Sequence, residues 1–328
     1  MHHFVIETDR LRLRPLTLDD AEAEFAWVGD PKVNRYMPYS LYTSVGQVRE
    51  YLAGVVADTS PHLEFGFERR SDGLLIGAGS VGPNKAEGAW EIGYNLRADC
   101  WNQGYATEAA RALVDFARHT FGATDFFATH AVANPASGRV MEHCGMTFDR
   151  FCEYSRFDGS ETFPAKAYRM HLDSPGPNAG RLAGLAQLLT DSGADFTLIR
   201  RQTPILSVQD AADFCDPALA APSLVVQTEQ RLMLMIVSST RGLLDFSALK
   251  GELGFNKLKL ADPERVRQET GFAPGVIPLV GTNLPCIFDE RLYALPHIFG
   301  GSGDDRFTLK IAPGDARRLN DVRAGIPA

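Results

Sequence analysis

The feature that most constrains this 328-residue chain is residues 101–109, Trp-Asn-Gln-Gly-Tyr-Ala-Thr-Glu-Ala, between a strand-like segment, 90–96, and a helix-like segment, 105–120. Gly104 permits a tight turn, and the small residues Ala106 and Thr107 let backbone N–H groups at a helix start approach a phosphate closely. A strand–glycine–helix junction without a ligand has the same local pattern, so the neighbouring sequence has to support the assignment. The stretch predicts a pyrophosphate cradle.

Two further blocks accompany the cradle. Glu91-Ile-Gly-Tyr-Asn-Leu96 precedes it, and Asn134-Pro-Ala-Ser137 opens a second helix that ends in Gly-Met. With these blocks, residues 8–172 resemble the GNAT acetyltransferases, specifically the RimJ/RimL-like branch, whose cradle also reads Trp-x-x-Gly-Tyr-Ala-Thr-Glu-Ala. The general family pattern has Gln or Arg where this chain has Trp101.

The resemblance implies a GNAT fold of the α/β (α+β) class with a mixed central sheet, and acetyl-CoA as the cosubstrate. It also implies a set of cofactor-binding residues. These are Tyr94, Leu96, Gln103, Gly104, Tyr105, Ala106, Thr107 and Asn134.

Length, composition and net charge limit the number of domains and the kinds of partner that the chain can have. The chain has room for two domains of ordinary size, and its 45% hydrophobic content can build buried cores. A net charge of −8 gives no overall attraction to nucleic acid or to an anionic membrane. The five cysteines are odd in number and show no CxxC spacing, which argues against a disulfide framework and a zinc site. With no apolar leader or membrane-spanning run, we expect a soluble cytoplasmic protein without a metal.

Periodicity predicts the elements of the first half. Residues 11–16 alternate as a first strand, Thr17 and Ser44 precede two helices, and 65–69, 75–81 and 89–96 form a meander. The cradle helix is followed by an apolar strand, 125–132, a helix that Asn134 caps before Pro135, and a closing hairpin, 147–154 with 165–171.

The chain then changes character. Residues 173–180, Asp-Ser-Pro-Gly-Pro-Asn-Ala-Gly, are turn formers and helix breakers, so we expect a linker between a domain at 1–172 and a domain at 181–328. The second half should contain a helix over 182–189, a strand at 196–199 and a capping box, Ser207-Val-Gln-Asp210. An apolar hairpin over 222–238, a helix start at Asp262-Pro263 and a strand at 307–311 follow.

Residues 181–323 resemble the YbaK/ProX family, which hydrolyses mischarged aminoacyl-tRNA, and the resemblance implies an α/β editing domain. The motifs that carry it include Lys257-Leu-Lys-Leu-Ala-Asp-Pro-Glu-Arg-Val266 and Thr270-Gly-Phe-Ala-Pro-Gly-Val-Ile-Pro278. The family's Ala-Lys-x-Leu lysine is replaced by Pro222, and in its Gly-x-x-x-Pro loop Gly275 is followed by Pro278 one place early. Asp289 and Gly300 match the family pattern. These five positions define the editing-like pocket.

Acetyl transfer needs an uncharged amine and a proton for the departing thiolate. Glu91, on the strand leading into the cradle, is the candidate general base if it faces the groove; a surface glutamate is the alternative. Many GNAT enzymes use a Tyr seven residues after the capping Asn as the acid, but Met141 stands there. Ser137 is therefore the candidate partner of the coenzyme sulfur, and a helix-start hydroxyl is its alternative role.

The loop over residues 30–40 is rich in aromatic and polar groups. In this family such a loop borders the acceptor groove, which makes Tyr36, Met37 and Tyr39 candidate substrate contacts, with packing under the loop as the alternative.

The sequence thus predicts an N-acetyltransferase acting on a primary amine, such as a protein N-terminus, a small amine or an aminoacyl group. The editing-like domain would recognise the substrate, and aminoacyl-tRNA is a further candidate partner. Two rival hypotheses remain open: a trans-editing aminoacyl-tRNA hydrolase with an accessory acetyltransferase, and a module that only binds an amino-acid-bearing partner.

Overall fold

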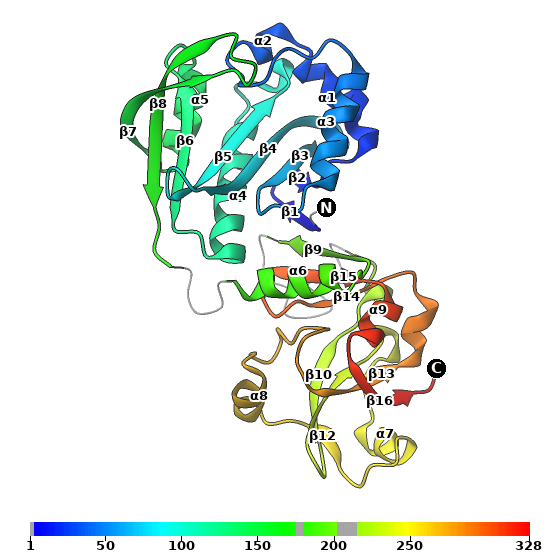
Figure 1. The fold of residues 1–328 in the computed structure, drawn as a ribbon. Coiled ribbons are helices and arrows are strands. Elements are labelled where there is room, and N and C mark those ends of the chain that lie inside the picture. Colours follow the sequence, from blue (N-terminus) through cyan, green and yellow to red (C-terminus); the bar gives the residue numbers. More distant parts are fainter. Residues whose placement is uncertain (1–2, 175–179, 202–214) are drawn as a thin grey trace. The chain divides into compact units, whose positions relative to one another are not determined.

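The chain folds into two compact units, Met1–Gly180 and Arg181–Ala328. The computed structural model describes residues 3–174, 180–201 and 215–328 (Figure 1). Each unit has its own hydrophobic core. The predicted capping box at 207–210 and most of the predicted linker lie outside the described residues.

The first unit is a mixed sheet with helices on both faces. Its helices are α1 (Ala21–Val28), α2 (Pro31–Asn34), α3 (Val45–Ala57), α4 (Tyr105–Phe121) and α5 (Pro135–His143). Its strands are β1 (Phe4–Glu7), β2 (Leu11–Arg14), β3 (Leu63–Arg69), β4 (Leu75–Asn84), β5 (Ala89–Leu96), β6 (Asp125–Ala131), β7 (Thr147–Ser155) and β8 (Thr162–His171). They are arranged in the order β1-β2-β3-β4-β5-β6-β8-β7. The mixed fold class predicted from the sequence is confirmed.

Strands β5 and β6 are parallel and meet only at their beginnings. The paired residues are Trp90 with Phe126 and Glu91 with Phe127. Beyond them β5 continues alongside β4 as far as Leu96, while β6 continues alongside β8. The two strands therefore diverge toward their carboxyl ends and leave a split in the sheet (Figure 1).

Aromatic contacts fix which helix covers which face of the sheet. The ring centroid of Phe65 on β3 lies 5.5 Å from that of Phe116 on α4, and Trp90 on β5 stacks at 5.1 Å on Phe121 of the same helix. We call this side the α4 face. Since alternate residues of a strand share a face, Tyr94 also belongs to it.

The opposite side, which we call the α1 face, is covered by α1 and α3. Ala78 of β4 packs in one cluster with Trp27 of α1 and Leu52 of α3. Ala78 pairs with Asn95 across β4 and β5, and directly paired residues project to the same side. Alternation then assigns Glu91, Gly93 and Asn95 to the α1 face, opposite Tyr94.

Local signals located α1, α3, α4 and α5, but the predicted loop over residues 30–40 was wrong at its start, because Asp30 accepts from the Lys32 N–H and caps the short helix α2. The hydroxyl of Ser44 accepts from the backbone N–H of Gln47 at the start of α3, as an N-cap does. The prediction of a first strand at residues 11–16 was incomplete, because β1 precedes it. That strand is only four residues long, and its burial depends on a distant contact, the edge-to-face packing of Phe4 on Phe116 at 5.0 Å.

The second unit is also mixed α/β. Its helices are α6 (Arg181–Asp191), α7 (Phe246–Glu252), α8 (Pro263–Thr270) and α9 (Pro313–Arg318). Its strands are β9 (Phe196–Arg200), β10 (Ser223–Thr228), β11 (Leu232–Ile236), β12 (Leu258–Leu260), β13 (Pro285–Asp289), β14 (Ile298–Gly301), β15 (Phe307–Ile311) and β16 (Asp321–Ile326). They form the runs β14-β15-β9 and β12-β10-β11-β13-β16. The predicted hairpin corresponds to β10 and β11.

None of the helices in the described residues combines the length and the apolar composition that a membrane crossing requires. All five cysteines lie within the described residues as free thiols.

We expect residues 173–180 to be the preferred site of limited proteolysis, because turn formers fill this stretch and each unit has its own core. Brief subtilisin digestion of the native protein should leave two fragments, each with its own cooperative unfolding transition by circular dichroism. First cleavage inside either unit, or loss of structure in both fragments after cleavage, would contradict independent folding.

Candidate active site

Helix α4 begins at a left-handed turn that a side chain would strain. Gly104, its N-cap, has φ +82°. A Cβ at Gly104 would approach Nη2 of Arg10 to 3.3 Å. The first-turn N–H groups of a helix have no acceptor within the helix, so they form an anion site at the positive end of its dipole. The left-handed turn at Gly104 thus has the backbone geometry that a pyrophosphate cradle would require.

An ion pair between the half-buried Glu108 and the exposed Arg10, which the sequence did not reveal, braces this turn. Glu108 accepts hydrogen bonds from the Thr8 hydroxyl at 2.6 Å, the Arg10 backbone at 2.8 Å and Arg10 Nε at 2.7 Å. Burial opposes its ionisation, but these hydrogen bonds hold the pKa of Glu108 below its ordinary value. Arg10 also donates to the carbonyl of Gln103 and lies 4.5 Å from the centre of the Tyr105 ring. The turn is therefore pre-formed.

A hollow rich in arginine adjoins the turn. It has a volume of about 490 Å³. Its lining residues are Asp9, Arg10, Arg69, Arg70, Ser71 and Tyr105. Guanidinium groups suit a phosphate because their N–H donors match its oxygens. In the structure these arginines pair with Glu108, Asp72 and Glu7.

Tyr94 and Ser137 meet on the α4 face at the split. The Tyr94 hydroxyl donates to the carbonyl of Ser137 at 2.9 Å and lies 3.2 Å from the Ser137 hydroxyl. Burial raises the pKa of Tyr94, so this hydroxyl keeps its proton. Asn134 caps α5 as predicted, accepting from the Ser137 N–H at 3.4 Å. Met141, at the position of the family tyrosine, is 2% exposed and belongs to the core.

Glu91 lies on the other side of the sheet. Its carboxylate accepts from Nδ2 of Asn84 at 2.9 Å, and the side chain is half-buried on the α1 face. Glu91 and Ser137, the two predicted catalytic residues, thus approach the split from opposite faces. Ser137 is brought together with Tyr94 instead.

The other predicted cofactor residues surround the same turn. The side chain of Leu96 is buried, and its carbonyl accepts from Nε1 of Trp101 at 3.0 Å. Gln103 donates to the carbonyl of Asp99 at 2.9 Å. Ala106 and Thr107 are half-buried in the first turn of α4. A small side chain and a fixed backbone at these positions suit close approach of a phosphate.

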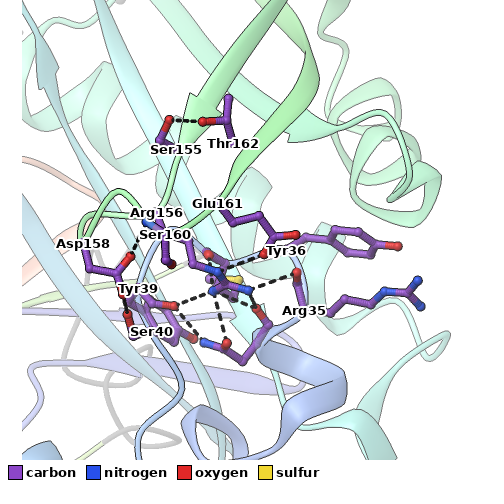
Figure 2. Close-up of polar contacts among 12 residues, drawn as sticks. Arg35, Tyr36, Tyr39, Ser40, Ser155, Arg156, Asp158, Ser160, Glu161 and Thr162 are labelled. Atoms are coloured by element: carbon purple, nitrogen blue, oxygen red, sulfur yellow. Dashed lines mark hydrogen bonds and ion pairs between the residues drawn. The ribbon is translucent and has the colours of Figure 1, made fainter.

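Arg156, which the sequence did not single out, anchors the loop that carries Tyr36, Met37 and Tyr39. Its Nη1 donates to the carbonyls of Met37 at 3.0 Å and Tyr39 at 2.9 Å, and to Oδ1 of Asn34 at 3.2 Å (Figure 2). It projects from the turn between β7 and β8.

Neighbouring groups of the same hairpin reinforce this anchor. The Tyr154 hydroxyl donates to the carbonyl of Tyr36 at 2.6 Å, and the Phe157 N–H donates to the carbonyl of Pro38 at 2.7 Å. The loop backbone is held through its carbonyls. We call residues 34–40 the acceptor loop.

The α1 face also contains a buried carboxyl. Glu24 of α1 is 3% exposed, and its Oε2 has no hydrogen-bond partner within the described residues. Burial, and then the negative charges of Glu64 and Asp20, raise the pKa of Glu24 to about 8. A carboxyl without a partner in such surroundings destabilises the fold once it ionises.

Similarity to known proteins decides the family. Residues 10–147 match the acetyltransferase (GNAT) domain family. The uncharacterized N-acetyltransferase YoaA of Bacillus subtilis is 31% identical over 144 residues, covering 43% of this chain and 81% of that protein. The chain belongs to the GNAT acetyltransferases. It is an acyltransferase of that family.

Solved structures similar to this GNAT protein include a GNAT-family acetyltransferase from Bacillus anthracis. It is 25% identical and has a TM-score of 0.46, with 51% of this chain and 98% of that chain covered. RimL, a ribosomal L7/L12 alpha-N-protein acetyltransferase in complex with coenzyme A, is 19% identical with a TM-score of 0.46, with 52% and 98% covered.

The second half matches another family. Residues 202–319 match the aminoacyl-tRNA editing domain, as the resemblance to YbaK/ProX proteins predicted. The GNAT domain is therefore followed by an editing-type domain.

Three of the residues predicted for the editing-like pocket, Pro222, Pro278 and Gly300, lie on neighbouring segments. A Cβ on Gly300 would lie 2.7 Å from the carbonyl oxygen of Ala221 and 2.6 Å from Leu279 Cγ, which places β14 against the neighbours of Pro222 and Pro278. Pro278 is buried. Gly275, with φ +91°, lies in an open turn three residues earlier. Pro222, predicted to stand where the family has its lysine, contributes an uncharged ring to this region.

Asp289 is held in place by hydrogen bonds from other residues of the second unit. It is fully buried, and Arg241 donates to both of its oxygens, Nε to Oδ2 at 2.5 Å and Nη2 to Oδ1 at 2.9 Å. The backbone N–H groups of Ser238 and Arg291 donate to it as well. Although burial opposes it, these donors hold the pKa of Asp289 below its ordinary value. Its acceptor sites are thus occupied by the protein itself.

We expect Glu24→Gln to stabilise the protein increasingly as the pH rises from 5 to 8. The pKa of Glu24 is raised from an ordinary 4.5 to about 8 by folding, so its penalty is absent below pH 4.5 and complete above pH 8. The gain in unfolding free energy should reach on the order of 1–4 kcal/mol at pH 8 by urea denaturation. The exposed neighbour substitution Glu22→Gln should show no such pH dependence, and a flat difference for Glu24→Gln would contradict the buried charge.

Proposed function

We propose that this GNAT enzyme transfers the acetyl group of acetyl-CoA to a primary amine that reaches the split between β5 and β6 from the α1 face. The observation that carries the proposal is the hydroxyl pair of Tyr94 and Ser137 at the split. It lies on the face of the sheet that also carries the helix beginning at the Gly104 turn.

The described residues fit the cosubstrate. A side chain at position 104 would strain the left-handed turn. With glycine there, the backbone of residues 103–107 would hold the pyrophosphate. The arginine-lined hollow would receive a further phosphate. When bound, acetyl-CoA supplies a thioester whose acyl carbon is open to attack by an amine.

Each face of the sheet contributes one part of the chemistry. Glu91 accepts a proton from the amine, directly or through a water molecule, as the new C–N bond forms. The C–S bond would then break, with the Ser137 hydroxyl donating a hydrogen bond to the departing thiolate sulfur. The Tyr94 hydroxyl keeps its proton and donates a hydrogen bond to the Ser137 carbonyl, which holds Ser137 in position.

The editing-type domain selects the acceptor in this proposal. The family lysine is replaced by Pro222, which has neither a charge nor a backbone N–H. Loss of a cation near a developing oxyanion typically costs about 10²–10³ in rate. Binding of an aminoacyl group therefore fits this domain better than hydrolysis. A trans-editing hydrolase is the second candidate, favoured by the match of residues 202–319.

The test is acetyl-CoA consumption by the full chain with amino acids, short peptides and aminoacyl-tRNA, together with release of free amino acid from the last. We expect consumption with a peptide or aminoacyl acceptor and little deacylation. Rapid deacylation without consumption of acetyl-CoA would favour the hydrolase.

Gly104→Val should abolish acetyl-CoA binding in isothermal titration calorimetry, because a branched side chain strains the turn and blocks the phosphate. Gly88→Val is the matched control, since Gly88 also has positive φ, at 61°, but lies in the turn between β4 and β5. Equal affinity in the Gly104 variant and the parent would remove the basis of the proposal.

Ser137→Ala should lower kcat about tenfold or more while leaving acetyl-CoA affinity nearly unchanged, as expected for an interaction that strengthens in the transition state. Steady-state kinetics with the best acceptor measures this, with the exposed Ser60→Ala as the control. Unchanged kcat would restrict the Ser137 hydroxyl to the start of α5.

A further inference from the structure

The buried carboxyl of Glu24 has no role in the proposed acetyl transfer. Glu24 is almost fully buried, and Oε2 finds no donor within the described residues. Besides burial, two carboxylates raise the pKa of Glu24, and the charge of Glu24 in turn adds to the effect of burial in raising the pKa of three tyrosines. These five groups come from the start of α1, the acceptor loop region, α3 and β3. They are Asp20, Tyr39, Tyr42, Tyr51 and Glu64. None of these groups carries a positive charge.

Tyr39 connects this carboxyl to the split. Tyr39 packs against the cluster that contains Ala21 and Val28, the residues that share the Glu24 side of α1. Burial, and then the charge of Glu24, raise the pKa of Tyr39. The Tyr39 hydroxyl accepts from Nδ2 of Asn95 at 3.4 Å. Asn95 lies on β5 beyond the last pairing with β6. Its Oδ1 is buried and also lacks a partner within the described residues.

The floor beside Asn95 is open. A Cβ built on Gly93 would have Ser80 Oγ, at 3.3 Å, as its single heavy-atom neighbour within 4 Å outside the adjacent residues. Gly93 lies between Glu91 and Asn95 on the α1 face. Two unpartnered acceptors, Glu24 Oε2 and Asn95 Oδ1, therefore lie on the side of the sheet that α1 covers.

We propose that Glu24, Tyr39 and Asn95 form the ammonium-recognition set of the acceptor site, so that the acceptor arrives as a cationic amine without a carboxylate beside it. This rests on the proposed function. An ammonium has three donors and no acceptor, which matches the unpartnered oxygens, and its charge offsets the repulsion between Glu24 and Glu64. A free amino acid would bring its own carboxylate toward the negative charges of Glu24 and Glu64. Amino-acid amides, peptide N-termini and aminoacyl esters avoid that repulsion.

Recognition by Glu24 also predicts a proton balance. Near pH 6.5 the unliganded carboxyl holds its proton, since its pKa lies at about 8. Pairing with an ammonium favours the ionised form, so the carboxyl loses its proton as the ligand binds. Binding should release close to one proton per amine, and Glu24→Gln has no such proton to release.

The experiment is calorimetric titration of serinamide and of serine into the full chain saturated with coenzyme A at pH 6.5, in two buffers of different ionisation enthalpy. We expect serinamide to bind at least tenfold more tightly than serine and to release a proton. Glu24→Gln should weaken serinamide binding at least tenfold and abolish the release, without changing coenzyme A affinity. Glu22→Gln, an exposed substitution on the same helix, should behave like the parent.

Absence of serinamide binding to the parent, or equal affinity and proton release in Glu24→Gln, would overturn the inference and leave Glu24 as a purely structural group. Failure of the proposed function would be seen separately, because acetyl-CoA consumption would then be absent with every amine tested. Since removal of the buried charge should stabilise the fold, loss of binding in Glu24→Gln cannot be attributed to unfolding, and thermal denaturation of the variant verifies this.

Discussion

The divergence of β5 and β6 is the constraint on which the first unit depends. Two parallel strands paired at only two positions leave backbone groups and side chains open at the split. Antiparallel pairing with β4 and with β8 holds each strand in place while the two separate. The side chains of each face have different chemistry at the split: neutral hydroxyls on the α4 face, carboxylates and an amide on the α1 face. In the proposed function, acetyl-CoA and the amine approach from these opposite faces.

Local sequence located most of the elements but not the contacts that make them a site. Helix starts at Ser44 and Asn134 and the turn at Gly104 depend on neighbours within a few residues, so their patterns are visible in the sequence. The bond between Arg10 and Glu108 joins residues 98 positions apart, and that between Arg156 and Tyr39 joins residues 117 apart. No local periodicity encodes such pairs.

The sequence predicted which residue types belong to the candidate site, but it did not predict how their side chains are arranged in space. Ser137 was identified, but its partnership with Tyr94 depends on how β5 and α5 meet. Glu24 was not singled out from the sequence, because only the packing of α1 on the sheet buries it. In the second unit, Asp289 matched a pocket pattern, yet Arg241 and two backbone donors already satisfy it.

The acceptor loop is held almost entirely through main-chain carbonyls, which accept from Arg156, Tyr154 and the Phe157 N–H. Carbonyls are the same whichever side chain a residue carries. Substitutions at Tyr36 or Met37 can therefore alter what the loop presents to an acceptor without altering the path of the loop itself. Single replacements in the loop could then change acceptor preference while Arg156 and the hairpin between β7 and β8 keep the loop backbone in place.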